Sequence, residues 1–177
     1  MANVRTQMTI TNSAQDVEDA CWVLEYLVHD LVLGPQLYEL FLEVGQRATV
    51  HSETETAVRR MYTAHILLTL NKVSEFLARY RSILPEDLRE SCRALNKELS
   101  RRRVRKLRNT FIGHILNNKT GRPITNSEIN EAFNTATDND LKGFLKWVHE
   151  PGVASSVDTV VGTLQRLHTR IRSANAK

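Results

Sequence analysis

Apolar residues recur at intervals of three and four along most of this chain, the spacing that places side chains on one face of an α-helix. No stretch keeps the alternation of a half-buried strand. A first helix is predicted to start near residues 13–16, which form a cap with an acidic first turn, and to end at Gly34-Pro35, because proline interrupts a helix. Its apolar face consists of Val17, Cys21, Leu24, Val28 and Leu31. A second helix is predicted from Pro35, with Leu37, Leu40, Phe41 and Val44 on one side.

The longest apolar stripe predicts a helix over about residues 53–80. Its members are Val58, Tyr62, Ile66, Leu70, Val73, Leu77 and Tyr80. Another helix should open at Pro85, and shorter ones are predicted near residues 127–137, 139–149 and 155–172, with a turn-rich loop over 117–123. The sequence therefore predicts an all-α, antiparallel helical bundle that forms a single domain over residues 1–177, with flexible ends at 1–12 and 173–177.

The apolar pattern changes phase shortly after residue 99. The helix that opens at Pro85 carries Leu88, Cys92, Leu95 and Leu99 at helical spacing. Continued in register, this stripe would reach Arg102, Arg103 and Lys106, but the apolar positions resume instead at Val104, Leu107, Phe111 and Ile115. We expect a kink, a break at Ser100, or a change in what the helix packs against.

A cluster of positive charge lies at this phase change. The net charge of the 177-residue chain is only +4, yet six of its 24 Lys and Arg fall within residues 101–108. Such a run can be a solvated helix face, or it can compensate the negative end of a neighbouring helix. Because the six cations surround most of a helix's circumference, their mutual repulsion favours a third interpretation, which is a site for a polyanion or an acidic protein.

Other classes of site find little support in the sequence. Cys21 and Cys92 have no Cys-x-x-Cys spacing and are predicted to be small buried hydrophobes. The six histidines do not cluster with carboxylates at metal-ligand spacing, and no phosphate-binding glycine loop or nucleophile elbow occurs. There is no secretory signal and no apolar run of the roughly 18 residues that a membrane span needs. We therefore expect a cytoplasmic protein without a metal, a cofactor or a membrane partner.

The segment 108–114 reads Arg-Asn-Thr-Phe-Ile-Gly-His and follows directly on the basic cluster. It resembles the signature of the HEPN superfamily, in which an Arg, usually followed by a polar residue, precedes a His with four to six residues between them. Five residues intervene here, and the polar residue is Asn109. The Gly before the His and the loop Lys-Thr-Gly-Arg-Pro at 119–123 are similar to the abortive-infection and toxin branches of the superfamily. The resemblance covers about residues 101–123.

A second Arg-to-His spacing occurs between Arg60 and His65. Met61 follows that arginine in place of a polar residue, and His65 lies beside the apolar stripe of the long helix. We interpret His65 as a mostly buried, hydrogen-bonded residue of that helix.

The resemblance implies a HEPN-like four-helix core with additional helices, a homodimer, and metal-independent endoribonuclease activity. In this chemistry RNA supplies its own nucleophile, the 2′-hydroxyl, so that the protein needs to move protons and stabilise charge. His114 would transfer the protons, Arg108 would bind the phosphate, and Asn109 would orient it. The products would be a 2′,3′-cyclic phosphate and a 5′-hydroxyl. The residues predicted to bind the RNA backbone are Arg101, Arg102, Arg103, Arg105, Lys119 and Arg122.

Two residues that lie six positions apart on a helix differ by about 240° in direction and about 9 Å in height. Arg108 and His114 therefore do not share one narrow face, and two motifs across a twofold axis would make a more complete site. We predict a homodimer whose interface includes this helix. The alternative hypotheses are a non-enzymatic helical module that binds nucleic acid or an acidic protein, and a protein held inactive by an antitoxin partner.

Overall fold

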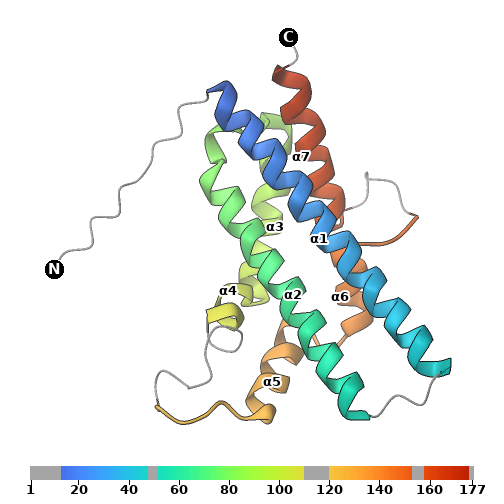
Figure 1. Cartoon of the computed structure of the whole chain (residues 1–177). Coiled ribbons are helices and arrows are strands. Elements are labelled where there is room, and N and C mark those ends of the chain that lie inside the picture. Colours follow the sequence, from blue (N-terminus) through green and yellow to red (C-terminus); the bar gives the residue numbers. More distant parts are fainter. Residues whose placement is uncertain (1–12, 48–51, 110–119, 153–157, 176–177) are drawn as a thin grey trace.

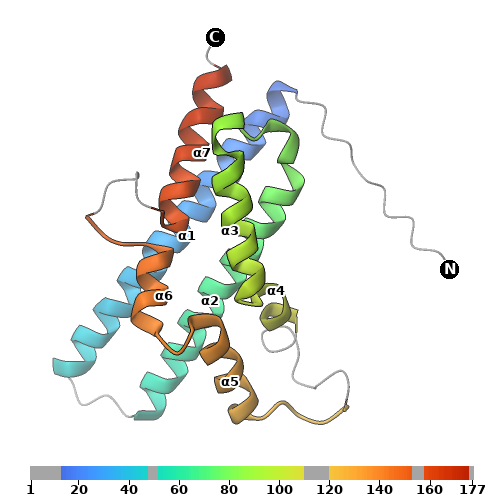
Figure 2. The same ribbon diagram turned by 180° about the vertical axis from the view of Figure 1, so that it is seen from behind.

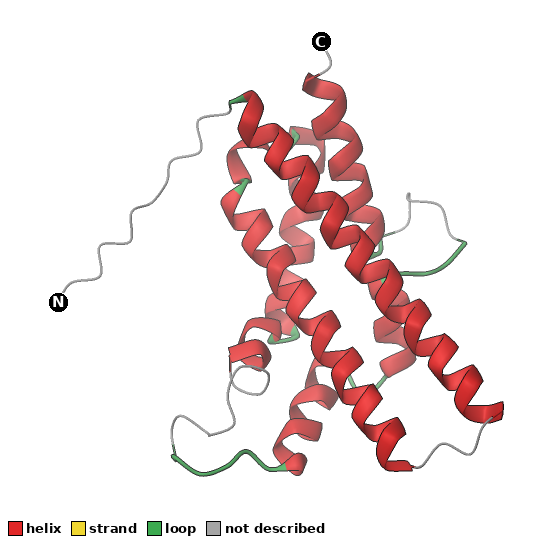
Figure 3. Ribbon diagram, viewed as in Figure 1, coloured by secondary structure: helices red, strands yellow, loops and turns green. Residues whose placement is uncertain are grey.

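The computed structural model describes residues 13–47, 52–109, 120–152 and 158–175. Its helices are α1 (Ala14–Arg47), α2 (Ser52–Arg79), α3 (Arg89–Arg101), α4 (Val104–Leu107), α5 (Asn126–Thr137), α6 (Leu141–Val148) and α7 (Val160–Asn175). Two 3-10 turns, η1 (Arg81–Ile83) and η2 (Glu86–Leu88), join α2 to α3. No strand occurs in these ranges (Figures 1 and 3), so the predicted all-α class is confirmed.

Four helices, α1, α2, α3 and α7, build the body of the bundle. α1 and α2 run antiparallel, α7 packs along α1, and α3 lies behind α2 and runs antiparallel to it (Figures 1 and 2). The predicted stripe of α2 faces this core, because Ile66, Leu70 and Val73 are fully buried. They meet Leu24, Leu27 and Leu31 of α1 together with Leu164 and Leu167 of α7 in one apolar cluster.

The predicted helix boundary at Gly34-Pro35 is wrong, because α1 continues through Pro35 to Arg47. A proline inside a helix costs about 3 kcal/mol. Tertiary packing on both sides of it offsets this cost. Leu31 and Tyr38 are buried, and the Tyr38 ring stacks on Tyr62 of α2 with a centroid distance of 4.5 Å. Both parts of the helix therefore remain against α2.

The expected break after α3 is confirmed and falls at Arg102 and Arg103. The backbone of Arg103 is left-handed, with φ of 55°, and the N–H of Arg103 donates to the carbonyl of Ser100. Leu99 and Val104 would point about 140° apart on one regular helix. Both are buried, so the chain must change direction between them.

The remaining elements follow the sequence pattern closely. α5, α6 and α7 lie where the three short helices were predicted, and α7 extends to Asn175, into the segment 173–177 that the sequence predicts to be a flexible end. Both cysteines are free thiols; Cys92 is buried and Cys21 is half-buried. Among the residues that the structure describes, none of the helices has the length and apolarity that crossing a membrane requires.

Candidate nucleic-acid interface

The helix break determines which side chains of the basic cluster reach solvent. α4 is one short helical turn whose Val104 and Leu107 are buried against the bundle. The chain continues from it through Arg108 and Asn109 in a wider π-helical turn. With the apolar side of α4 fixed in this way, its polar side chains project outward. On α4 and the residues that flank it, the polar side chains exposed to solvent are Arg103, Arg105, Lys106, Arg108 and Asn109.

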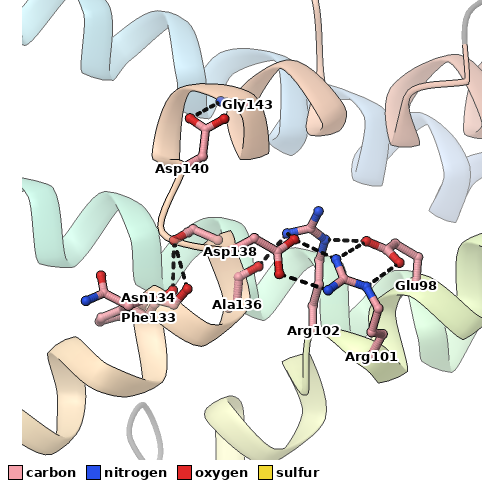
Figure 4. Close-up of polar contacts among 10 residues, drawn as sticks. Glu98, Arg101, Arg102, Phe133, Asn134, Ala136, Asp138, Asp140 and Gly143 are labelled. Atoms are coloured by element: carbon pink, nitrogen blue, oxygen red, sulfur yellow. Dashed lines mark hydrogen bonds and ion pairs between the residues drawn. The ribbon is translucent and has the colours of Figure 1, made fainter.

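Arg101 and Arg102 form a charge network with Glu98 and Asp138 (Figure 4). Arg101 binds Asp138 through two hydrogen bonds, of 2.8 Å from Nη1 and 2.6 Å from Nη2, and Glu98 through two more, of 2.8 Å from Nε and 2.6 Å from Nη2. The hydrogen bonds from Arg101 hold the pKa of both carboxyls below their ordinary values. Two cations thus meet two anions, and this part of the cluster is close to neutral.

Arg102 is a structural residue rather than a surface cation. Its side chain is only 10% exposed, its Nη1 donates to the backbone carbonyl of Ala136 at 2.6 Å, and its Nε lies 2.9 Å from Oε1 of Glu98. The guanidinium also lies over the rings of Phe144 and Trp147, at 5.5 and 4.6 Å from their centroids. The prediction that Arg102 binds RNA is therefore corrected. Its burial fits a role in holding the α3–α4 break against α5 and α6.

Of the two acidic partners of Arg101 and Arg102, the sequence pattern indicates Glu98 but not Asp138. Glu98 precedes the two arginines by three and four positions, which is the spacing of helical ion pairs. Asp138 was not visible in this way, because it lies at the end of α5 and reaches the break only through the tertiary fold. Arg101 remains half-exposed but is occupied by both carboxylates.

The other cations line a shallow surface hollow at the break. Its lining consists of Ser100, Arg103, Arg105, Lys106 and Asn109. Neither Arg103, Arg105 nor Lys106 forms an ion pair with an acidic side chain in the described ranges. The structure therefore brings Arg103 and Arg105, two predicted RNA-binding residues, together with Lys106, which lies outside the predicted set. An open hollow with three cations and an amide suits a phosphate group of a polyanion.

The candidate catalytic motif begins at the edge of this hollow. Arg108 Nη1 donates a 2.9 Å hydrogen bond to Oδ1 of Asn109, and both side chains are exposed. The bond fixes the orientation of the guanidinium and leaves the amide nitrogen of Asn109 as a second donor. His114 and Lys119 lie outside the described residues, so the predicted meeting of Arg108 with His114 stays a prediction.

Arg122 is drawn toward the start of α5. Its guanidinium binds Glu128 through two hydrogen bonds, of 2.9 and 3.1 Å. Glu128 forms a capping box with Thr125, and backbone and side-chain hydrogen bonds from Thr125, followed by Arg122, lower the pKa of Glu128. About half of the Arg122 side chain remains exposed. The positive charge of Arg122, which is predicted to contact the RNA backbone, is thus partly compensated by Glu128.

The second Arg-to-His spacing does not form a site. Arg60 and His65 lie on α2, where five positions separate them by about 140° around the helix. The expectation that His65 is mostly buried is wrong, because α2 presents it to solvent. No group of three or more His, Cys, Asp or Glu side chains suited to a metal ion occurs in the part of the chain that the structure describes.

The fold and the surface define an all-α helical bundle protein with a basic hollow at a helix break. No family model matches the sequence, and no curated protein matches it. In three dimensions the chain is similar to an integron cassette protein from the mobile metagenome of V. paracholerae. The two share 18% sequence identity with a TM-score of 0.76, over 92% of this chain and 99% of that chain. At this identity the likeness supports the shared fold alone.

Proposed function

We propose that the protein is a metal-independent endoribonuclease that binds the RNA backbone at the hollow beside α4. One observation carries the proposal. Three cations without described acidic partners, Arg103, Arg105 and Lys106, lie immediately before the Arg108-Asn109 pair that begins the HEPN-like motif. Phosphate binding and the candidate catalytic groups thus belong to one continuous stretch of chain.

The chemistry follows from the groups at this surface. The 2′-hydroxyl of RNA attacks the adjacent phosphorus, and the bond to the 5′-oxygen breaks. One imidazole accepts the proton of the 2′-hydroxyl, and a protonated imidazole donates a proton to the leaving 5′-oxygen. Arg108 stabilises the extra negative charge of the phosphorane, since a guanidinium oriented in advance does not have to reorganise. The amide nitrogen of Asn109 supplies a further hydrogen bond.

A homodimer would supply both protonation states at once. One chain contributes one His114, whereas the reaction uses a base and an acid. Two chains that meet near their Arg108–His114 segments would place two imidazoles around one phosphate.

The test is incubation of the purified protein with single-stranded RNA in EDTA, with Arg108→Ala and His114→Ala as the variants. His65→Ala is the matched control, because it removes an exposed histidine of α2 that also follows an arginine at a spacing within the motif's range. Wild type and the control should cleave and leave 2′,3′-cyclic phosphate ends, whereas both motif variants should lose cleavage and keep their thermal unfolding. Cleavage that requires a divalent metal, or that survives in His114→Ala, would overturn the proposal.

The second candidate is a non-catalytic module that binds nucleic acid. It is favoured by the position of the hollow, whose cations precede the motif and can hold a phosphate without His114. RNA binding by the wild type without any cleavage, unchanged in His114→Ala, would select this function.

A further inference from the structure

A second basic site lies at the opposite end of α3 from the hollow. Where α2 turns through η1 and η2 into α3, four arginines border a groove of about 950 Å³ with Cys92 among its lining residues. They are Arg79, Arg81, Arg89 and Arg93. No acidic residue belongs to the lining, and none of the four forms an ion pair with a described carboxylate. Four like charges around one groove repel one another, and a bound polyanion would offset that repulsion.

Local contacts hold two of these arginines in place. Arg79 lies over the ring of Tyr80, 5.6 Å from its centroid, and Arg89 donates a long hydrogen bond of 3.4 Å from Nε to the carbonyl of Leu84. Arg89 and Arg93 are four positions apart on α3 and therefore share one face. The groove is thus lined by cations from α2, η1 and α3.

The same face of α3 leads from this groove to the hollow beside α4. Asn96 lines the groove and Ser100 lines the hollow. The two are one helical turn apart, and Ser100 Oγ donates to the carbonyl of Asn96 at 2.8 Å. From Arg89 to Ser100 the helix rises by about 16 Å. Figure 2 shows α3 running from the η1–η2 connection to α4 without an intervening element on its near side.

The two glutamates of α3 lie on another exposed flank of the helix. Glu90 and Glu98 line a different hollow, together with Asp87 and Asp158. Three of these carboxylates are paired, Glu98 with Arg101, Asp87 with Arg170 and Asp158 with Arg166. The four arginines of the groove have no described carboxylate partner, so a polyanion is favoured along the flank of α3 that carries the groove.

We propose that single-stranded RNA binds along α3, with one part of its backbone in the hollow beside α4 and a more distant part in the four-arginine groove. This rests on the proposed function and adds an extended substrate to it. The contacts go to phosphates, because the aromatic residue next to the groove, Tyr80, is buried and offers no stacking surface. Recognition is therefore tolerant of sequence and sensitive to salt.

The experiment compares Arg89→Gln/Arg93→Gln with a matched control, Lys142→Gln/Lys146→Gln, which removes the same charge from exposed positions on α6. Binding of a fluorescent RNA of about 20 nucleotides, longer than the roughly 4–16 nucleotides of common single-strand sites, is measured against salt. Loss of two phosphate contacts should lower the slope of log K against log salt by about 1.4 and the affinity about 25-fold at about 0.1 M salt. The control should keep the wild-type slope.

Cleavage separates this inference from the proposed function. If the wild type cleaves RNA, the Arg89→Gln/Arg93→Gln variant should have a higher KM for the long RNA. Its kcat and its cleavage of a dinucleotide should equal those of the wild type. If the wild type binds RNA without cleaving it, a reduced slope in this variant still supports the path along α3. Equal salt slopes for RNA binding in the Arg89→Gln/Arg93→Gln variant and in the wild type would overturn the proposed path along α3. The same conclusion would follow if the variant changed only the binding of inorganic phosphate or of an acidic peptide.

Discussion

Replacing Arg102 by Met should destabilise the protein without weakening the proposed binding of RNA. Replacing its neighbours on the hollow should have the opposite effects. The substitution removes the hydrogen bond to the buried carbonyl of Ala136, which costs about 1–3 kcal/mol when the acceptor is left unpaired. It also removes the cation–π contacts with Phe144 and Trp147, worth about 0.5–2 kcal/mol. Because methionine keeps much of the apolar contact, we expect a net loss of about 2–4 kcal/mol.

For a protein of this size each kcal/mol shifts the melting temperature by about 2–4 °C, so the expected decrease is about 5–15 °C. Circular dichroism at 222 nm measures it. The salt dependence of RNA binding, measured well below the melting temperature, should match that of the wild type. The comparison variant Arg103→Gln/Arg105→Gln should unfold near the wild-type temperature with a smaller salt slope. If Arg102→Met melts like the wild type, or loses as much salt slope as the comparison variant, the assignment of Arg102 to the interior is wrong.

Three further outcomes are expected. The pKa values of Glu98 and Asp138 are lowered in the folded state. Their stabilising effect is therefore present above their ordinary pKa values of 4.5 and 3.8 and is lost as the pH falls through the lower folded values. In urea unfolding across this pH range, the free energy of unfolding of Asp138→Asn should fall less steeply than that of the wild type. Burial raises the pKa of the Cys92 thiol to about 11, so iodoacetamide at pH 8 should label it only after denaturation, as mass spectrometry can verify. Gly34→Ala should stabilise the protein by up to about 1 kcal/mol in urea, because a new Cβ would meet its neighbours at ordinary distances of 3.5–3.7 Å inside a continuous helix; a loss of stability would contradict that packing.

Local periodicity was sufficient to predict most of the bundle. The stripe of α2 and the phase change after Leu99 predicted a long helix and a break, because each depends on which side chains one helix can bury at once. The boundary at Pro35 was predicted wrongly for the opposite reason. Helix continuity there depends on contacts with α2, such as the stacking of Tyr38 on Tyr62, which comes from a later part of the chain.

The candidate site also has one part that the local sequence predicts and another that depends on the tertiary fold. The concentration of cations at residues 101–108 was evident from the sequence, but not which of them remain available. That depends on Asp138, whose approach to Arg101 and Arg102 is a property of the tertiary fold. The four-arginine groove was missed because its members come from two helices and a turn, so no single window of sequence contains a dense run.

At Arg103 the left-handed backbone favours glycine, whereas the basic hollow needs a cation. A residue with a Cβ pays about 1–2 kcal/mol for this conformation, which glycine would adopt freely. Glycine there would relax the chain and at the same time remove a cation from the hollow. Selection for greater stability would thus favour an exchange that removes one of the cations proposed to bind phosphate.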